Sequence, residues 1–287
     1  MDFELSGRLL VIAGGASGIG LAVAQEARIH GMRVAILDSS AAQAAAALAE
    51  LDPAGDNCMA EVLDVRDGAA CEAAVERIEA RLGPIDALVT CAGISRPEPA
   101  ESMSDETWDA VLGVNLGGMF RTVRSVGRRM VARRRGAIVN ISSTDGLGGH
   151  AARVNYSASK HGVIGLTRSL AIEWGRHGVR VNAVAPGVVE TPLLRRNVPL
   201  DHIENAMIDR VPMGRFSSAA EQARACLFLL SDAASYVNGA TLAVDGGLTA
   251  GYFTRWNGAD YGSSALLARD AYGPPPSSTS STPEGQS

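Results

Sequence analysis

The sequence predicts an α/β fold in which a doubly wound parallel sheet of about seven strands lies between two layers of helices. Two observations support this prediction. Short apolar runs alternate along the chain with longer segments of helical character, which is the order of a parallel sheet with crossover helices. The runs are continuously apolar and do not alternate in polarity, as expected of strands that are buried on both faces.

The predicted strands follow one another with helical segments between the first six. They are residues 8–14, 33–38, 58–65, 85–93, 136–143, 179–187 and 240–247. Two of the helical segments, 20–31 and 68–83, end in glycine, which is frequent just after a helix C-terminus. The alanine-rich segment 41–50 consists of strong helix formers.

We predict one domain over residues 1–250 of the 287-residue chain, because no linker or internal repeat divides this part. Residues 251–272 form an extension with several aromatic side chains: Tyr252, Phe253, Trp256 and Tyr261. We expect this extension to pack over a subunit interface or the mouth of a binding site. Residues 273–287 are rich in Pro, Ser and Thr and are predicted to be a disordered tail.

Composition and charge argue against several classes of partner. The net charge is −5, so nothing in the total favours nucleic acid or an anionic membrane. The basic run 127–135 falls at a predicted helix end, where cations in solvent are favourable. The sequence shows no membrane-spanning stretch and no signal peptide, and its four cysteines lack metal-ligand spacing. We therefore expect a cytoplasmic protein that uses no metal.

A glycine-rich loop, residues 13–20, lies between the first predicted strand and the first predicted helix. Gly14, Gly18 and Gly20 allow a tight turn and a close approach of the backbone to a ligand. The helix that begins here presents free amides and a positive dipole end to a phosphate. A glycine-rich turn alone is a weak signal, but the strand before it and the helix after it favour a dinucleotide site.

Asp38 ends the second predicted strand, eighteen residues after Gly20. A carboxylate there can accept hydrogen bonds from both hydroxyls of an adenosine ribose, and it repels a 2′-phosphate. No arginine or lysine stands in the loop or directly after Asp38 to offset that repulsion. The sequence therefore favours NAD over NADP.

Tyr156 and Lys160 stand four residues apart, separated by small residues. In a helix they project from the same face, one turn apart. Taken alone, the pair is either an incidental feature of an exposed helix or a phenol placed beside an ammonium to exchange a proton.

The motifs together resemble those of the short-chain dehydrogenase/reductase family in its compact single-domain form, which implies a Rossmann-type fold. The resemblance extends from about Leu5 to Ala250. It depends on these motifs in order: GGASGIG (14–20), LDV (63–65), CAG (91–93), VN (114–115), IVNISS (138–143), YSASK (156–160), PGVVETP (186–192) and VDGG (244–247).

The resemblance implies a catalytic set of Asn115, Ser143, Tyr156 and Lys160. Ser143 stands thirteen residues before Tyr156, as the family's serine does, and is expected to donate a hydrogen bond to the substrate oxygen. Tyr156 is expected to act as general acid or base, with its pKa lowered by the charge of Lys160. The resemblance further implies that Lys160 binds the cofactor ribose, that the Asn115 backbone holds a water beneath the lysine, and that Asn140 is structural.

The resemblance also implies contacts to the cofactor. Asp64 and Val65 match the pair that contacts adenine, while Thr191 and the backbone of Val189 match the positions that hold the nicotinamide carboxamide. The full predicted cofactor-binding set is Gly14, Ser17, Gly18, Ile19, Gly20, Asp38, Asp64, Val65, Ala92, Gly93, Tyr156, Lys160, Pro186, Gly187, Val189 and Thr191.

The sequence departs from the family pattern at two positions. Ala13 replaces the usual threonine of the glycine loop, and Cys91 replaces the asparagine of the usual NAG motif. We expect both changes to affect local rigidity more than chemistry, with Cys91 acting as a small apolar residue and not as a redox thiol.

The resulting prediction is an NAD-dependent oxidoreductase that interconverts a secondary alcohol and a ketone. The resemblance implies a pocket walled by residues 94–98, 144–155 and 188–212. The last segment is expected to form a lid with a short mobile helix, and its Val, Leu and Ile residues favour an apolar cyclic, aryl, steroid-like or terpenoid-like substrate. Charged residues near the predicted pocket either contact a polar substrate or, as we prefer, lie on a solvated rim: His150, Arg153, Arg195 and Arg196. The alternatives are a 3-oxoacyl-type ketoreductase, which usually prefers NADP, and a non-catalytic NAD-binding sensor or scaffold.

The resemblance further implies association of subunits through two long helices, at roughly 100–130 and 156–174. We expect a homotetramer, with a dimer as the second alternative, and a small-molecule substrate as the only other partner.

Overall fold

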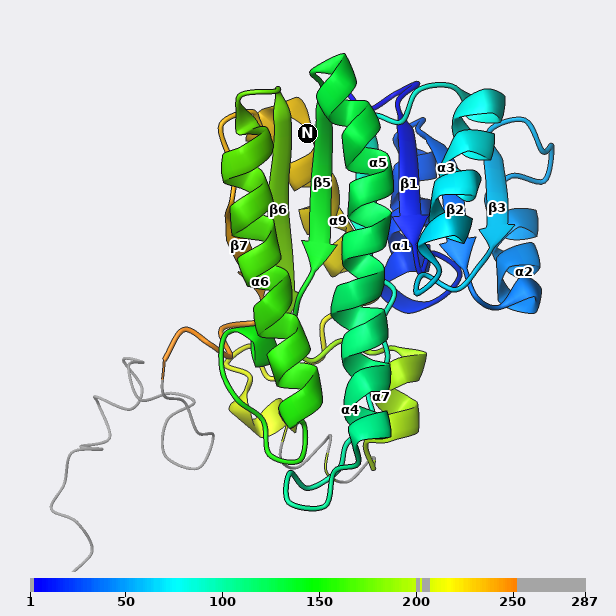
Figure 1. Cartoon of the computed structure of the whole chain (residues 1–287). Helices are drawn as coiled ribbons and strands as arrows, with labels where there is room; N and C mark the ends of the chain where they lie inside the picture. Colours follow the sequence, from blue (N-terminus) through cyan, green and yellow to red (C-terminus); the bar gives the residue numbers. More distant parts are fainter. Residues whose placement is uncertain (1–2, 200–201, 203–206, 252–287) are drawn as a thin grey trace, which may run out of the picture.

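A single parallel sheet forms the middle of the molecule (Figure 1). The computed structural model describes residues 3–199, 202 and 207–251. Within these residues the sheet has seven strands in the order β3-β2-β1-β4-β5-β6-β7, and every neighbouring pair is parallel. The strands are β1 (Leu9–Ala13), β2 (Arg33–Asp38), β3 (Cys58–Val62), β4 (Ala87–Thr90), β5 (Gly136–Ile141), β6 (Val179–Pro186) and β7 (Thr241–Val244). The predicted fold class, a doubly wound Rossmann-type sheet, is confirmed.

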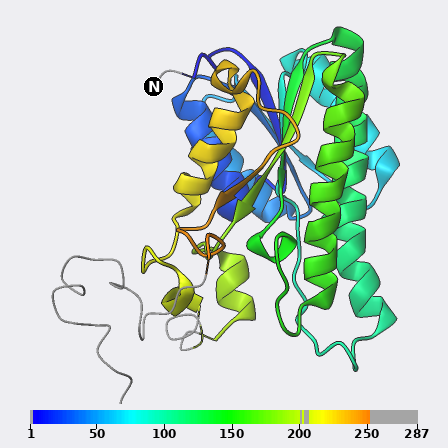
Figure 2. The ribbon, with the colours of Figure 1, turned by 90° about the vertical axis from the view of Figure 1, so that its left-hand side faces the viewer.

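Helices cover both faces of the sheet, as the edge-on view shows (Figure 2). One face carries α1 (Gly18–Ile29), α2 (Ala41–Leu51) and α9 (Ala219–Leu230). The other carries α3 (Gly68–Leu82), α5 (Met119–Arg133) and α6 (Val154–Gly175), and α4 (Asp105–Leu112) runs into α5 through a π-helical turn at Gly113–Gly118. Past the carboxyl ends of the strands lies α7 (Pro192–Asn197), and short 3₁₀ turns occupy Thr144–Gly146, Ile208–Arg210 and Asp232–Ala234.

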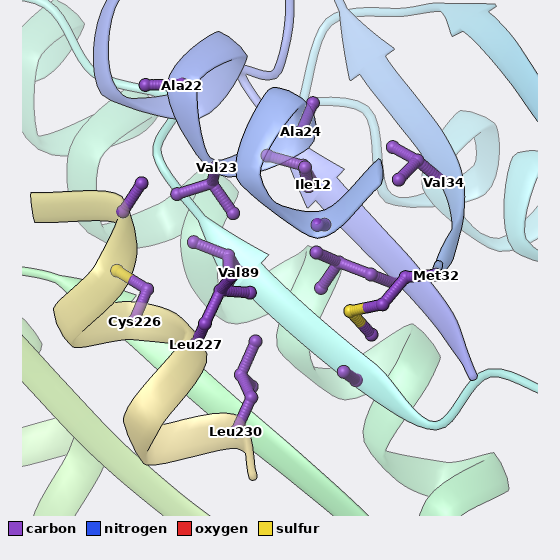
Figure 3. Close-up of a cluster of buried hydrophobic side chains, with 14 of the residues drawn as sticks. Ile12, Ala22, Val23, Ala24, Met32, Val34, Val89, Cys226, Leu227 and Leu230 are labelled. Atoms are coloured by element: carbon purple, nitrogen blue, oxygen red, sulfur yellow. The ribbon is translucent and has the colours of Figure 1, made fainter. Parts of the chain in front are cut away.

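The core consists of two apolar layers, one on each side of the sheet. Successive residues of β1 alternate between them: Ile12 packs with α1 and α9, while Val11 packs with α3 and α5. Figure 3 shows the first layer, where Val23 of α1 and Leu227 of α9 lie close to Ile12. Both faces of β1 are therefore buried, which explains why this strand is apolar at every position.

Two helices end near the predicted glycines. Helix α3 ends at Leu82, directly before Gly83, which has a φ of +85°. Helix α1 ends at Ile29, and Gly31 two residues later has a φ of +74°. Glycine adopts this left-handed backbone without the steric cost that other residues meet, so both glycines turn the chain back toward the next strand.

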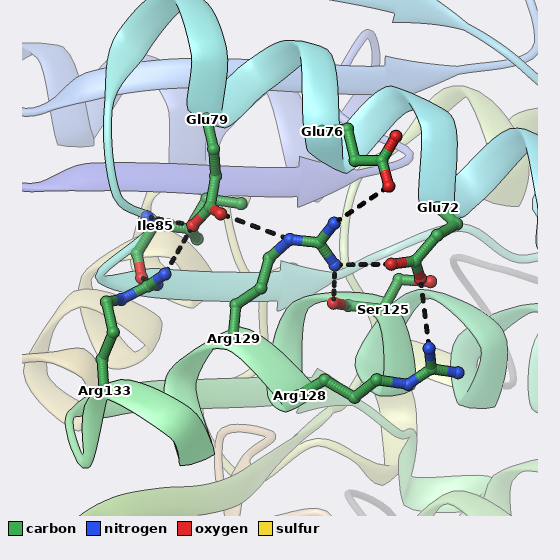
Figure 4. A network of polar contacts seen from close by, with 8 residues as sticks. All are labelled: Glu72, Glu76, Glu79, Ile85, Ser125, Arg128, Arg129 and Arg133. Carbon is green, nitrogen blue, oxygen red and sulfur yellow. Dashed lines mark hydrogen bonds and ion pairs between the residues drawn. The ribbon is translucent and has the colours of Figure 1, made fainter.

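The basic run 127–135 covers the end of α5, as predicted, but it is not simply solvated. Arg129 lies between three glutamates of α3, with 2.7 Å to Glu72 and 3.2 Å to Glu79 (Figure 4). Arg133 also pairs with Glu79, at 2.7 Å. These charges therefore connect α5 to α3.

Some predicted boundaries differ from those of the structure. Strand β3 ends at Val62, so Leu63–Val65 follow the strand and lie at its carboxyl end. The aromatic residues of the 251–272 extension and the 273–287 tail lie outside the described residues. Within the described part, no helix is both long and apolar enough to cross a membrane, and no group of acidic, Cys or His residues is arranged to hold a metal.

Candidate active site

One cavity of about 600 Å³ opens at the carboxyl ends of the strands. Its walls come from the segments that follow β1 to β6. Strand order reverses between β1 and β4, and ligands of open α/β sheets bind at such a switch point. Every predicted cofactor-binding residue lines this cavity, and so do Ser143, Tyr156 and Lys160 of the predicted catalytic set. These predicted residues therefore lie together around one cavity.

The glycine loop forms one end of the cavity. A side chain at Gly14 would place its Cβ 2.5 Å from the Ala92 nitrogen, and one at Gly20 would overlap the Gly14 carbonyl oxygen. Ser17 precedes the first turn of α1 but makes no side-chain cap hydrogen bond. The first amides of α1 are thus left for a ligand, and they face the cavity at Gly18 and Ile19. This cradle fits a phosphate of a dinucleotide.

Asp38 lies beside the loop at the end of β2. One carboxylate oxygen accepts the Ala16 amide at 3.1 Å, and the other accepts the Ser40 amide at the same distance. The carboxylate therefore fixes the glycine loop against the start of α2 while it lines the cavity.

Arg66, which sequence reasoning missed, also lines this end of the cavity. Its guanidinium pairs with Asp64, with 2.6 Å between Nη2 and Oδ2, and this contact holds the pKa of the Asp64 carboxyl below its usual value. The only sequence signal was its position two residues after Asp64. Because Asp64 balances its charge, Arg66 does little to offset the negative charge of Asp38.

Helix α6 places Tyr156 and Lys160 on its face toward the cavity. Lys160 Nζ lies 5.5 Å from the centroid of the Tyr156 ring and donates a hydrogen bond to the Ile141 carbonyl at 2.9 Å. Lys160 is buried, and its neighbour Ser159 is fully buried against Asn115. The small residues between Tyr156 and Lys160 thus allow close packing.

Ser143, the third member of the predicted catalytic set that lines the cavity, lies just after the end of β5. Its side chain lies beside Tyr156, where it acts to lower the pKa of the phenol, and it accepts the Asp145 amide at 3.1 Å. The adjacent Ser142 hydroxyl donates to the Lys160 carbonyl at 2.9 Å, so it braces the helix. Asn140, predicted to be structural, is buried and bonds Thr90 and Thr167.

The expected lowering of the Tyr156 pKa by Lys160 is wrong for the free protein. Burial raises the pKa of Tyr156 to about 12, the charge of Asp145 adds to this increase, and the Ser143 hydrogen bond and the charge of Arg153 oppose it. Burial also lowers the pKa of Lys160 to about 8. Tyr156 is partly buried and Lys160 is buried, and desolvation is the largest cause of both shifts.

Asn115 lies in the π-helical turn between α4 and α5 and is the predicted residue that does not line the cavity. Its side chain holds both backbone groups of Ile94: Oδ1 accepts the amide at 2.8 Å and Nδ2 donates to the carbonyl at 3.0 Å. A second bond joins Nδ2 to Ser159 Oγ at 3.1 Å. Asn115 thereby connects the loop after β4 to α6.

The segment after β6 forms the opposite wall. Pro186, Gly187 and Val189 line the cavity, and Thr191 begins α7 by accepting the Leu194 amide at 3.3 Å. The predicted short helix of the lid is therefore present at Pro192–Asn197.

Cys91 also lines the cavity, and burial raises the pKa of its thiol to about 12. The protonated form is therefore favoured at neutral pH, which argues against a reactive thiolate.

Polar residues surround the reacting end near Tyr156. The cavity wall there includes His150, Arg153 and Arg196, which the sequence analysis singled out. It also includes Ser95, Arg96 and Asp145, which lie in the segments 94–98 and 144–155 that the resemblance placed around the pocket but which were not named individually. Arg195 does not line the cavity and pairs with Glu190.

Comparisons with known proteins cover most of the chain. Residues 14–249 match the model of a family described as enoyl-(acyl carrier protein) reductase. The chain is 41% identical over 250 residues to D-threitol dehydrogenase of Mycolicibacterium smegmatis, which covers 86% of this chain and 95% of that protein. It is 40% identical over 245 residues to 3-oxoacyl-(acyl-carrier-protein) reductase of Thermotoga maritima, which covers 85% of this chain and 99% of that protein.

A solved structure resembles the fold closely. Gluconate 5-dehydrogenase from Burkholderia cenocepacia, in complex with NADP and tartrate, superposes with a TM-score of 0.83 at 37% identity, covering 88% of this chain and 98% of that one. The family match, these relatives and the ordered motifs agree: the chain belongs to the short-chain dehydrogenase/reductase family of oxidoreductases, which bind a nicotinamide cofactor.

Proposed function

We propose that the protein is an NAD-dependent oxidoreductase that interconverts a secondary alcohol and a ketone. One observation carries this proposal: a single cavity joins a phosphate cradle and Asp38 at one end to Ser143, Tyr156 and Lys160 at the other. A protein that only bound NAD would need the first end alone, so the second end favours catalysis over a sensor or scaffold.

The chain's own residues manage the proton and the substrate oxygen. Tyr156 accepts the hydroxyl proton during oxidation and returns it during reduction. Ser143, which lines the cavity with Tyr156, donates to the substrate oxygen as charge develops there. A nicotinamide cofactor held along this cavity by the glycine loop, Asp38 and Lys160 would supply the hydride acceptor for oxidation and the hydride donor for reduction.

Lys160 and Asn115 assist Tyr156 and Ser143. Lys160 has more N–H groups than its single bond to Ile141 uses, so it can also donate to a cofactor ribose. Its charge next to the Tyr156 ring favours the phenolate. Asn115 is a positioning residue that fixes the loop after β4 against α6.

Asp38 supports NAD as the cofactor. It ends β2 and lines the cavity. Its two hydrogen bonds come from the neutral amides of Ala16 and Ser40, and neither comes from a cation. A 2′-phosphate at this position would be repelled.

We propose a small polar substrate in place of the apolar frame that the sequence favoured. Val188, Leu194 and Met207 supply one apolar wall, but Asp145, His150 and Arg153 line the reacting end. A polyol fits such a lining better than a steroid, because its hydroxyls can pair with these groups.

Reduction of NAD or NADP, followed at 340 nm with a panel of polyols and simple secondary alcohols, tests the proposal. We expect reduction of NAD by a subset of polyols. Turnover only with NADP would remove the cofactor assignment but keep the chemistry. Reduction of an acetoacetyl thioester with NADPH, at a rate above any polyol, would favour the ketoreductase alternative, which the 40% identity to the Thermotoga maritima enzyme supports. Cofactor binding without any turnover would favour the sensor alternative.

We also propose a homotetramer that assembles through α4–α5 and α6, with a dimer as the alternative, in the cytoplasm. Phe120 on α5 and Ile172 on α6 are large apolar side chains exposed on these helices, at 41% and 85%. Sedimentation equilibrium tests the assembly, and a monomer at micromolar concentration would contradict it.

A further inference from the structure

The arginines that line the cavity differ in their partners. We call the end formed by the glycine loop and Asp38 the adenosine end, because the proposed NAD would place its adenosine there. At this end the charge of Arg66 is neutralised by Asp64. At the reacting end, the guanidinium groups of Arg96, Arg153 and Arg196 make no hydrogen bond or ion pair with any of the residues that the structure describes. By contrast, Arg195, which does not line the cavity, pairs with Glu190 at 2.5 Å. Three arginines without a described charge partner thus line this end, Arg153 partly buried and Arg96 and Arg196 exposed to solvent.

Arg153 is the best placed of the three. Its guanidinium carbon lies 6.0 Å from the centroid of the Tyr156 ring, beside the proposed acid–base group. It occupies the residue just before α6, where Ser, Thr, Asn or Asp would accept an amide bond, and it makes no such bond. The preceding residue, Ala152, has a φ of +58°, which is costly for a residue other than glycine. Local helix stability therefore does not explain an arginine here.

Two hydrogen bonds join the loop of Arg153 to the loop of Arg96. The Glu98 amide donates to the Ala152 carbonyl at 2.8 Å, and Asn155 Nδ2 donates to the Arg96 carbonyl at 3.1 Å. The two arginines therefore stand on one braced wall, and Arg196 approaches from α7 on the opposite wall.

Negative charge at this end comes from one described lining residue, Asp145. Its carboxylate lies 3.5 Å from His150 Nδ1 and does not contact any of the three arginines. Positive charge thus exceeds negative charge around the reacting centre, even before Lys160 is counted. An anion on the substrate would restore the balance, and the planar fork of a guanidinium matches a carboxylate with two parallel hydrogen bonds.

We propose that the substrate is a small polyhydroxy carboxylate whose carboxylate group is bound by Arg153, with Arg96 and Arg196 adding positive charge. The Asp145–His150 pair then bonds a hydroxyl near the reacting carbon. This inference rests on the proposed function, because it assigns the substrate class of the same site.

A matched pair of substrates tests it. D-Gluconate and D-glucitol differ at one end of the chain, where a carboxylate replaces a hydroxymethyl group. We expect kcat/KM of the wild type to be higher for D-gluconate by about 30-fold, the effect of one charged hydrogen-bonded contact. Arg153→Gln should reduce this ratio at least about tenfold. Arg195→Gln, on the same lid but turned away to Glu190, should leave the ratio unchanged.

The ratio separates carboxylate binding from other roles of Arg153. Its charge also favours the Tyr156 phenolate, so its loss changes turnover of both substrates equally through the tyrosine. If Arg153→Gln lowered kcat/KM equally for D-gluconate and D-glucitol, the proposal would be overturned. A wild-type preference for D-glucitol or for a sugar phosphate would also overturn it.

A binding measurement keeps this test independent of turnover. Calorimetric titration of D-gluconate into the protein loaded with reduced cofactor forms a complex that cannot react. We expect binding that weakens in Arg153→Gln and with added salt. Binding of this kind without turnover of any alcohol would remove the proposed function but keep the anion site. Turnover of neutral polyols without D-gluconate binding would keep the proposed function but overturn the anion site.

Discussion

The two ends of the cavity are built in different ways. At the adenosine end the backbone forms the site: the glycine loop, the first turn of α1 and the amides that Asp38 holds. At the reacting end side chains form it: Ser143, Tyr156 and Lys160, together with arginines from separate loops. Binding at the first end depends on the backbone conformation and on the absence of side chains that would block the ligand. The chemistry at the second end depends on the charge and the desolvation of its side chains. The two ends should therefore respond differently to substitution and to pH.

The largest effect is expected from Tyr156→Phe at the reacting end. Loss of one hydroxyl removes the acid–base group, so kcat should fall by about 10²- to 10⁴-fold. The adenosine end is unchanged, and the dissociation constant of NADH, measured by fluorescence titration, should stay within about threefold, because that affinity comes chiefly from the backbone cradle. Substantial turnover by this variant would mean that another group carries the proton.

The complementary change is Gly20→Ala at the adenosine end. The added methyl would overlap the Gly14 carbonyl oxygen, so the loop must move. Overpacking of this kind costs about 1–3 kcal/mol, and we expect NADH affinity to fall by about 10- to 100-fold. Gly148→Ala is the matched control, because a Cβ there meets nothing within 4 Å and its φ is not positive. Wild-type affinity in Gly20→Ala would show that the loop does not form the phosphate cradle.

The pH dependence of stability should distinguish the two ends. Burial lowers the pKa of Lys160 from 10.5 to about 8, so between pH 8 and 10.5 the native state binds fewer protons at this site than the unfolded chain. The free energy of unfolding therefore gains from Lys160 as the pH rises through this window. Tyr156 has the opposite sign: its pKa is raised from 10.0 to about 12, so its contribution is complete below pH 10 and is lost above it.

Urea unfolding from pH 8 to pH 10 thus isolates the lysine. We expect the wild type to gain about 2 kcal/mol relative to Lys160→Met over this range. A constant difference between the two proteins would mean that Lys160 keeps an ordinary pKa and is more hydrated than its burial indicates.

The same contrast explains what the sequence could predict. The glycine loop and the Tyr156–Lys160 pair are local patterns, with fixed spacing on one turn or one helix, and all these residues line the cavity as expected. The strand runs predicted the sheet because burial on both faces leaves a continuous apolar signature. Boundaries were less accurate, as at β3, because the strand ends where pairing with β2 stops.

The reacting end was predicted less completely because it depends on tertiary packing. The resemblance placed segments 94–98 and 144–155 around the pocket, but no local motif distinguishes Arg96 or Asp145 within them, and the two loops follow different strands. The pKa of Tyr156 was predicted in the wrong direction for a related reason. Spacing shows that a lysine is near, but only the packed structure shows that desolvation is the largest influence on both pKa values.

The smallest expected effect concerns Asp38, where a side chain enters the backbone-built end. Its two oxygens already accept the Ala16 and Ser40 amides, so the residue has either a structural role alone or a structural and a selective one. Asp38→Asn keeps the size and one acceptor but removes the charge that repels a 2′-phosphate. If Asp38 selects the cofactor, the ratio of kcat/KM with NAD to that with NADP should fall about tenfold.

Asp67→Asn is the matched control, because Asp67 also accepts two backbone amides, those of Ala69 and Ala70, but does not line the cavity. It should change the NAD to NADP ratio by less than about threefold. An equal loss of affinity for both cofactors in Asp38→Asn, with a lower melting temperature, would instead assign Asp38 to bracing the loop. Cofactor choice would then lie with the backbone as well, and the adenosine end would select by shape alone.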